Sequence, residues 1–449
     1  MALNAPYLPP NPHRPRAFGG KGAEGLKKEI TSSKPGAKEI MDLRAVTPGS
    51  WALKTGRKTP DQALHASFLH LSQLADRMNR HRIGIVALTL LAAMVAPTGA
   101  AESQEQEGGR DYWPTQKWRV ADPATQGVDP NKLADAWRFA SGQNTEALLI
   151  VRHGYIVAEY YGADFHADES HDSYSMAKSV CSAVVGIAIQ QKKIQSVQQK
   201  LTEFFPMRGE PADAPHRGGI TIAHLLTMTS GIDFDNKVNY PQMKASPDWV
   251  DYVLSRPVTH APGSFWRYTA DPTLLSGIVS KATGMSMYAY AKSELFDPIG
   301  MNSVRWKGGP NDHTNGNGDL FATARDCARF GFLYLNNGRW DGRQILPADW
   351  VERSTQPCRS AERAPCDCWQ PEGRPAASGA PFDYGYLWWC RRLPGVPADA
   401  YYAFGGFGQF ILIVPSLDVV MVRLGHDRVQ SDLVILPELA ARIVAAVKP

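Results

Sequence analysis

The sequence lacks several signatures that would assign it to a common class of protein. It contains no Gly-x-x-x-x-Gly-Lys-Ser/Thr loop for a nucleotide and no His-Glu-x-x-His motif for a catalytic zinc. The formal net charge is only +4 over 449 residues, and no basic patch carries interleaved aromatic residues. Domains that bind nucleic acid are normally more basic than this. We therefore expect no nucleic-acid partner, no metal site and no cofactor.

Near the N-terminus, the uncharged apolar run at residues 83–96 is too short to cross a membrane comfortably. It follows the basic stretch Met78–Arg82 and precedes Pro97–Ala101, which is rich in small residues. This layout is typical of a secretory signal peptide, which we expect at residues 78–101. Translation would then begin at Met78, and residues 1–77 would be an upstream artefact or a disordered extension. The alternative is a signal anchor formed by residues 83–96.

Cysteine is scarce, with six residues, and their positions fit a mature chain of residues 102–449 that is periplasmic or secreted. Cys181 and Cys327 fall in apolar helical stretches and are expected in the core. The others lie in or after a Pro- and Ala-rich segment: Cys358, Cys366, Cys368 and Cys390. One or two disulfides of undetermined pairing are expected there, with a zinc knot as the alternative.

Strand patterns occur at both ends of the mature chain and helical patterns lie between them. Residues 146–161 form two β-branched and aromatic runs around His153-Gly154, which predicts a hairpin. Further strands are expected at 384–391, 408–414 and 418–424, and helices at 130–140, 222–228, 274–282, 322–337 and 434–447. We expect an α+β fold in which a mostly helical region, about residues 200–320, is inserted into a sheet. A cleft would form where the two parts meet.

The stretch Ser175-Met176-Ala177-Lys178 opens an apolar helical run and carries the first chemical signal. Residues three apart share a helix face, so Lys178 would lie over the hydroxyl of Ser175. A buried ammonium loses proton affinity, which would let Lys178 accept the serine proton. The alternative is a helix that begins with a serine cap and carries a solvated lysine.

Seven motifs in order resemble the serine β-lactamase-related hydrolases, which include class C β-lactamases, D-alanyl-D-alanine peptidases, family VIII esterases and 6-aminohexanoate-oligomer hydrolases. They are S-M-A-K at 175–178, H-L-L-T-M-T-S-G at 224–231, P-G-S-F-W-R-Y at 262–268, A-T-G-M-S-M-Y-A-Y through F-D-P-I-G-M-N at 282–302, A-T-A-R-D-C-A-R-F-G at 322–331, Y-G-Y-L-W-W at 384–389 and G-G-F-G-Q at 405–409. The resemblance spans about residues 146–447. It implies an antiparallel sheet flanked by helices.

The resemblance also implies roles for individual residues. Ser175 would be the nucleophile that forms an acyl-enzyme, and Lys178 would take or share its proton. Tyr268 would relay the proton to the leaving group and later activate water; the alternative is a packed tyrosine. Gly405 would let a strand approach closely, and the backbone N–H of Gly406 would join that of Ser175 as an oxyanion hole.

Two departures from the family pattern bear on the substrate. Ala270 stands where the family has the asparagine of its Tyr-x-Asn element, and Ala403 stands where the family has the lysine of Lys-Thr-Gly. No cation is therefore available there for the carboxylate of a penicillin or a peptide. Phe404 and Trp266 are expected to contact the substrate and to make the site apolar. The sequence leaves the roles of Asp271 and His426 open.

The sequence thus predicts an exported serine hydrolase that cleaves a small ester or amide through an acyl-enzyme on Ser175. A D,D-peptidase or weak β-lactamase is the alternative within the same class. A catalytically silent relative that serves as a binding module is the alternative from another class. The identity of the substrate and the oligomeric state stay undetermined, and membrane contact is expected only through the signal peptide or an anchor.

Overall fold

The structure is a computed structural model that describes residues 110–206, 214–358, 383–426 and 434–448. Several sequence-based predictions lie outside these residues: the extension at 1–77, the signal peptide at 78–101 with its apolar run 83–96, and the cysteines Cys366 and Cys368. Within the described part of the chain, no helix is long and apolar enough to cross a membrane.

The central element is a five-stranded antiparallel sheet with the strand order β2-β1-β10-β9-β8. Its strands are β1 (Thr145–Arg152), β2 (Tyr155–Tyr161), β8 (Tyr401–Gly405), β9 (Gln409–Val414) and β10 (Val419–Gly425). Two strands come from the beginning of the described chain and three from its end. The predicted sheet of terminal segments around an inserted region is therefore confirmed.

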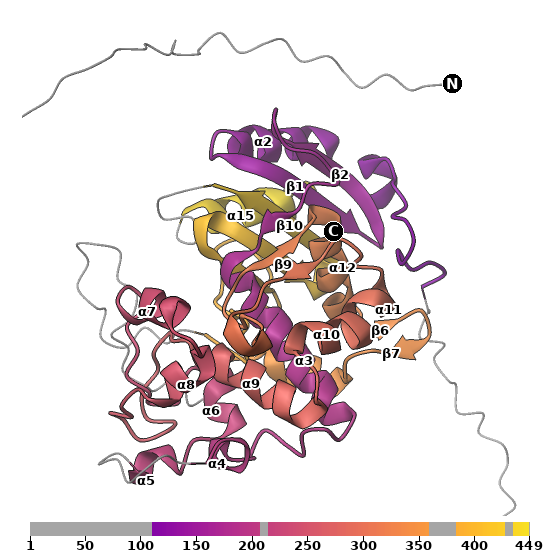
Figure 1. Ribbon diagram of the computed structural model, residues 1–449. Helices are drawn as coiled ribbons and strands as arrows, with labels where there is room; N and C mark the ends of the chain where they lie inside the picture. The colour runs from indigo at the N-terminus through magenta and orange to yellow at the C-terminus, as the bar shows by residue number, and fades with distance from the viewer. Residues whose placement is uncertain (1–109, 207–213, 359–382, 427–433, 449) are drawn as a thin grey trace, which may run out of the picture. The chain divides into compact units, whose positions relative to one another are not determined.

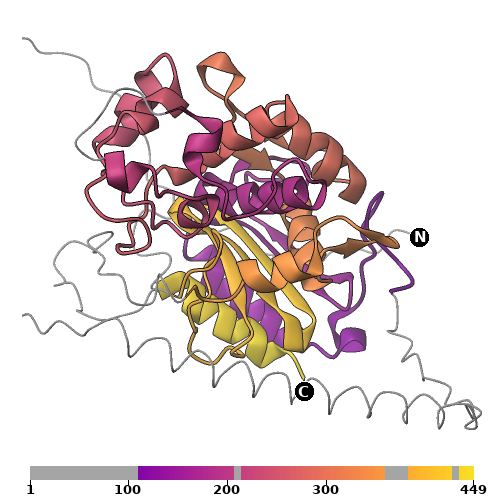
Figure 2. The same cartoon turned by 90° about the horizontal axis from the view of Figure 1, so that it is seen from below.

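Helices cover both faces of the sheet. The helices of the described residues are α2 (Pro130–Ser141), α3 (Ala177–Gln190), α4 (Leu201–Phe204), α5 (Ala214–Arg217), α6 (Ile222–Leu226), α7 (Asn239–Ala245), α8 (Trp249–Leu254), α9 (Asp271–Thr283), α10 (Met287–Ala291), α11 (Asp297–Ile299), α12 (Ala324–Leu335), α13 (Ala348–Ser354) and α15 (Leu436–Ala446). Helices α2 and α15 pack on one face, and α3 and α12 on the other (Figure 1). Figure 2 shows the sheet between the yellow α15 and the helices of the inserted region.

Strand alternation explains why both faces are apolar. Leu148 and Ile150 of β1 pack with α2 and α15, whereas Leu149 and Val151 pack with α3 and α12. Successive side chains of a strand point to opposite faces, so a strand covered on both sides has a continuous apolar sequence. All four residues are almost completely buried, which fixes the register of β1 within the sheet.

The predicted hairpin is present between β1 and β2. His153 and Gly154 form its turn with φ values of 51° and 82°. A two-residue turn with positive φ at both positions matches the twist of the strands it joins.

The inserted region contains α4 to α11 and the short strands β4 (Arg305–Trp306) and β5 (Leu320–Ala322). Together with β3 (His171–Asp172) these strands form a three-stranded sheet, with β5 between β3 and β4. A separate hairpin pairs β6 (Arg339–Trp340) with β7 (Arg343–Gln344). Strand β3 leads directly into the segment that carries Ser175.

The strand predicted at residues 384–391 is wrong. Only single bridges occur there, Tyr384 with Trp389 and Trp389 with Tyr402. Leu387 has a φ of 61°, and its N–H donates to the carbonyl of Leu226, so the segment turns instead of extending. Tyr384 and Trp388 are nonetheless buried, and Tyr386 and Trp389 are half-buried.

Candidate active site

The predicted nucleophile lies in a tight turn between β3 and α3. Residues Tyr174–Met176 form a single 3₁₀ turn, and Tyr174 has a φ of 46°, in the left-handed region. The carboxylate of Asp172 accepts a hydrogen bond from the Tyr174 N–H at 2.8 Å, which holds this strained backbone. Ser175 is thereby presented at the head of α3 and is only half-buried.

Lys178 lies directly behind the serine. Its Nζ is 3.1 Å from Ser175 Oγ and donates to the carbonyl of Asn317 at 2.9 Å. The side chain is 4% exposed, and burial lowers its pKa from 10.5 to about 7. With one N–H held by Asn317, a neutral amine can turn its lone pair to the serine hydroxyl. Asn317 could not be predicted from a motif, because it contributes a backbone carbonyl and any residue type carries one.

Tyr268 lies against the same lysine. Lys178 Nζ is 4.7 Å from the centroid of the Tyr268 ring, within cation–π distance. The ring is half-buried and packs near Trp389, with 6.0 Å between the ring centroids. The structure thus brings together the three side chains that the sequence selected for catalysis.

Gly405, at the end of β8, lies against the turn that carries the serine. A Cβ at this position would be 2.2 Å from the carbonyl oxygen of Ser173 and 3.2 Å from the N of Met176. No larger residue fits without moving one of the two backbones, in agreement with the close approach expected for Gly405. Gly406 is less confined, because a Cβ there would lie 3.9 Å from its nearest neighbour, the side chain of Tyr174.

The turn at Gly406–Gly408 is braced by two buried side chains. The amide of Gln409 donates to the carbonyls of Gly406 at 3.2 Å and Gly425 at 2.5 Å, and accepts from the N–H of Gly425 at 3.0 Å. Arg423 donates to the carbonyl of Gly408 at 2.5 Å and to the hydroxyl of Thr145 at 2.8 Å. Both side chains are fully buried. The motif G-G-F-G-Q contained Gln409, but only the structure shows which carbonyls it holds.

Two residues expected to contact the substrate lie elsewhere. Trp266 is only 2% exposed and packs edge-on against Tyr384, so it supports the site from within the core. Phe404 stacks on Phe410 with 5.4 Å between ring centroids, on the face that α2 and α15 cover. Because side chains alternate along β8, Phe404 points away from the face of Gly405.

The position of the missing family cation is occupied by an alanine on the serine side of the sheet. Ala403 packs with α3 and α12 and is fully buried. Arg267 forms an ion pair with Asp233, and Arg423 is completely buried. Neither guanidinium therefore stands ready to replace the lysine as a carboxylate ligand.

Asp271, next to Ala270, is the first residue of α9 and is completely buried. Burial raises the pKa of its carboxyl to about 7, and Ser230 Oγ donates to it at 2.9 Å. Its described contact is thus with Ser230, beneath the site.

The cysteines of the helices are core residues, as expected. Cys181 and Cys327 are buried free thiols, and burial raises the pKa of both. Cys390 is also a buried free thiol with a raised pKa. Thiols of this kind are poor nucleophiles because the reactive thiolate is suppressed.

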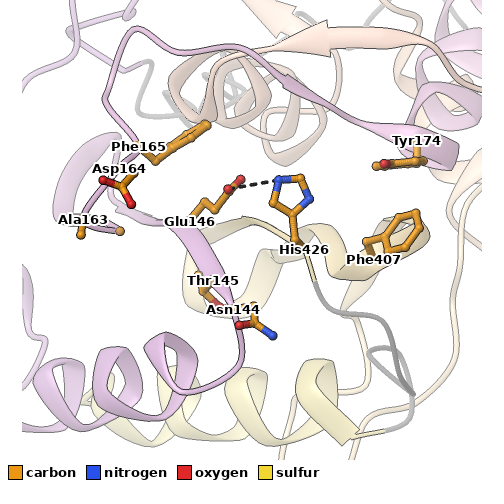
Figure 3. A pocket seen from close by; sticks show the side chains of 10 residues that line it. Asn144, Thr145, Glu146, Ala163, Asp164, Phe165, Tyr174, Phe407 and His426 are labelled. Atoms are coloured by element: carbon orange, nitrogen blue, oxygen red, sulfur yellow. Dashed lines mark ion pairs between the residues drawn. The ribbon is translucent and has the colours of Figure 1, made fainter. Parts of the chain in front are cut away.

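A cavity of about 930 Å³ lies beside the serine turn. Tyr174 and Phe407 line one side of it, and their ring centroids are 4.8 Å apart. Figure 3 shows these two rings facing the opposite side, where His426 and Glu146 meet. His426 therefore lines the same cavity as Tyr174 and Phe407, the residues next to Ser175 and Gly406 in the chain.

Known proteins resemble this chain over nearly all of the described region. The beta-lactamase family model matches residues 145–444. The 6-aminohexanoate-dimer hydrolase of Paenarthrobacter ureafaciens is 27% identical over 62% of this chain and 72% of its own length. Esterase EstB of Burkholderia gladioli is 26% identical over 34% of this chain and 44% of its own.

A family VIII carboxylesterase is similar in fold. It superposes with a TM-score of 0.57 at 16% sequence identity, over 72% of this chain and 99% of its own. The family model covers well over half of the chain, so the resemblance inferred from the seven motifs is confirmed. The chain belongs to the beta-lactamase family of serine hydrolases.

Proposed function

We propose that this hydrolase cleaves a small, neutral ester or amide through an acyl-enzyme on Ser175. The observation that carries the proposal is the buried amine of Lys178, 3.1 Å from Ser175 Oγ, with its pKa lowered to about 7. About half of such amines are free of their proton at pH 7, and this neutral form is the one that can act as a general base. The relatives named as a dimer hydrolase and an esterase support this class of reaction.

In the first half-reaction, Lys178 takes the proton of Ser175 while the serine oxygen attacks the carbonyl carbon of the substrate. The negative charge that forms on the carbonyl oxygen is stabilised by the backbone N–H groups of Ser175 and Gly406. The bond to the leaving group then breaks, and that group receives its proton from Lys178 through Tyr268. Lys178 Nζ lies 4.7 Å from the centroid of the Tyr268 ring, and the proposed relay requires the Tyr268 hydroxyl to approach this amine during the reaction.

In the second half-reaction, water replaces the leaving group. Tyr268 and Lys178 accept a proton from water as it attacks the acyl carbonyl, and the same two N–H groups stabilise the oxyanion again. The proton returns to Ser175 Oγ as the acyl bond breaks. The free acid leaves, and the enzyme regains its starting state.

Substrate preference follows from the missing cation. Ala403 offers no donor to a carboxylate, and Arg267 and Arg423 are held elsewhere. A charged hydrogen bond of that kind contributes about 1.5–3 kcal/mol. A neutral ester needs no such contact, so esters are favoured over β-lactams and peptides with a C-terminal carboxylate. The D,D-peptidase or weak β-lactamase reading is disfavoured on the same ground.

A direct comparison of substrates tests this preference. We expect kcat/KM for p-nitrophenyl acetate or butyrate to exceed that for nitrocefin by at least about 100-fold, which is near the upper end of what such a contact supplies at about 1.4 kcal/mol per factor of ten. Both are measured on one preparation, with D-Ala-D-Ala peptides and aminohexanoate dimers alongside. Equal or faster turnover of nitrocefin would contradict the assignment. No turnover of any substrate would favour the silent binding module.

Export to the periplasm or medium is part of the proposal and rests on the composition of residues 78–101. If the segment is a signal peptide, the native protein begins near Glu102. Mass spectrometry of the N-terminus measures this directly. Abundant peptides from residues 1–77 in the native protein would contradict a start at Met78. Retention of residues 83–96 in the native protein would favour the signal anchor.

A further inference from the structure

Three side chains from distant parts of the chain meet in one cluster. Glu146 and His426 line the cavity of Figure 3, and His171 contacts Glu146. Glu146 comes from β1, His171 from β3, and His426 follows β10. Glu146 Oε2 is 3.0 Å from His171 Nε2, and Glu146 Oε1 is 3.1 Å from His426 Nε2. The two imidazole rings are 4.8 Å apart at their centroids. One ligand atom of each residue lies within 4.8 Å of the others.

The tautomer of His171 is fixed by its backbone neighbour. Its Nδ1 lies 2.7 Å from the carbonyl oxygen of Asp172. A carbonyl only accepts hydrogen bonds, so Nδ1 must carry a proton. In the neutral ring, Nε2 then has a lone pair, and this lone pair is directed toward the carboxylate of Glu146.

That arrangement leaves a buried polar atom without a partner. The His171 side chain is 5% exposed. Among the residues that the structure describes, neither His171 Nε2 nor Glu146 Oε2 has a hydrogen bond, although the two atoms are 3.0 Å apart. Two buried lone-pair acceptors that face each other are unfavourable unless a proton or a metal cation lies between them, and the geometry here is not that of a hydrogen bond. This orphaned, inward-facing nitrogen is the observation that points to a ligand.

We propose that Glu146, His171 and His426 form a binding site for a divalent transition metal of the zinc class. Imidazole and carboxylate are ligands that such metals prefer. Tetrahedral zinc with bonds of about 2.0–2.1 Å holds its ligands roughly 3.3 Å apart. The separations from the two Glu146 oxygens, 3.0 Å to His171 Nε2 and 3.1 Å to His426 Nε2, are close to this value. Ligand atoms in the set lie up to 4.8 Å apart, so the exposed His426 has to move inward to complete the coordination. The bond from His171 Nδ1–H to a carbonyl is the outer contact typical of a metal-bound histidine.

His426 supplies the adjustable ligand. Its side chain is 60% exposed, so its ring can move to close the ligand set. Its backbone is anchored, because its N–H donates to the carbonyl of Asn144 at 3.1 Å. His171 is held on one side by its hydrogen bond to the carbonyl of Asp172. On the other side it makes an edge-on contact with Phe165, with 6.0 Å between the ring centroids. A metal would thus bind to His171, which is already fixed in place, and draw in the exposed ring of His426.

Three protein ligands leave a fourth position for water or a small ligand, beside the cavity of about 930 Å³. The metal would tie β1, β3 and the end of β10 together. Since β3 is followed at once by the strained turn at Tyr174, the site would stabilise the segment that presents Ser175. The ligands are far apart in the sequence, which explains why no short metal motif exists.

The test is metal binding by the full-length protein, produced without a histidine tag and stripped with a chelator. Calorimetric titration with ZnCl₂ is expected to give one zinc per chain and a higher thermal midpoint. Co²⁺ is expected to give the visible absorption of a tetrahedral site. His426→Ala and His171→Ala should each weaken zinc binding by at least about tenfold, in line with losses seen at metal sites. The matched control is His153→Asn at the exposed hairpin turn, which should bind zinc like the wild type.

Absence of stoichiometric binding of either metal, or unchanged affinity in His426→Ala and His171→Ala, would overturn the proposal and leave an ion-pair cluster. If circular dichroism shows His171→Ala to be unfolded, His426→Ala carries the test, because that side chain is largely exposed. Zinc binding is expected to persist in Ser175→Ala. The metal site and the proposed hydrolysis can therefore succeed or fail separately.

Discussion

At the scale of single residues, the main physical cost in this molecule is the burial of Lys178. An ammonium transferred from water to an apolar interior is strongly disfavoured. The flanking residues of α3 are almost all apolar and buried, and no carboxylate contributes to its pKa, so the lysine loses proton affinity instead of forming an ion pair. The same feature that weakens the fold thus makes the side chain a base at neutral pH.

The pH dependence of the reaction tests this view. Because the neutral form of Lys178 is the base, kcat/KM is expected to rise with pH and level off above an apparent pKa of about 7. Two pH units below that value, the neutral fraction and the rate fall by about 100-fold. An ester hydrolysis assay, either quenched at fixed times or followed by fluorescence, measures kcat/KM between pH 5 and 9.

Variants of Lys178 and Tyr268 test the same proton transfer. Lys178→Ala and Tyr268→Phe should each lower kcat by roughly 10²-fold or more, while KM changes much less. The exposed Lys193→Ala serves as control. Near-normal kcat in both variants would show that the Ser-Lys-Tyr mechanism is wrong.

Gly405 gives a second prediction at this scale. In Gly405→Ala the new Cβ would lie 2.2 Å from the Ser173 carbonyl, so β8 must move away from the serine turn. Loss of one oxyanion donor typically lowers kcat by about 10²–10³-fold, and a similar loss is expected here. Gly142→Ala is the control, because its Cβ would have only ordinary contacts, the nearest at 3.5 Å. An active Gly405→Ala enzyme would exclude this strand from the oxyanion site.

At the scale of elements, the site depends on two short turns held side by side. The turn at Tyr174–Met176 is fixed by Asp172, and the turn at Gly406–Gly408 is fixed by Gln409 and Arg423. Each brace is a side chain that satisfies backbone groups of a turn, which regular secondary structure cannot satisfy. The positions of the two N–H groups proposed as oxyanion donors therefore depend on residues that never touch the substrate.

The positioning role of Gln409 is testable. Gln409→Leu keeps the volume but removes three hydrogen bonds to backbone carbonyls and one from the Gly425 N–H. We expect kcat to fall by about tenfold or more with KM nearly unchanged, because the Gly406 N–H shifts relative to the oxyanion. Stability should fall by about 1–3 kcal/mol. The exposed Gln195→Leu is the control. A rise in KM as large as the fall in kcat would favour a general packing defect.

The elements themselves were largely predictable, and the error is informative. The hairpin at β1 and β2, the helices α2, α9, α12 and α15, and the strands β9 and β10 all have local patterns that their burial confirms. The segment 384–391 has the aromatic alternation of a strand, yet it turns at Leu387. The burial of its side chains does not alternate as in a strand, because long-range contacts to α6 and β8 fix the backbone.

At the scale of the whole molecule, motif order selected Ser175, Lys178 and Tyr268, which the structure brings together, and chain order predicted the architecture. The contributions that were missed come from backbone groups and distant segments. The carbonyl of Asn317 carries no sequence signal, and Phe404 was assigned to the site although the strand turns its side chain away. The cluster of Glu146, His171 and His426 is likewise assembled only by folding.

The central claim is that Ser175 becomes covalently acylated. A fluorophosphonate probe followed by intact-mass and peptide mass spectrometry measures this most directly. We predict one probe per chain on Ser175, with labelling and ester turnover both abolished in Ser175→Ala and both retained in the exposed control Ser264→Ala. Labelling that persists in Ser175→Ala, or that maps to another residue, would contradict the account.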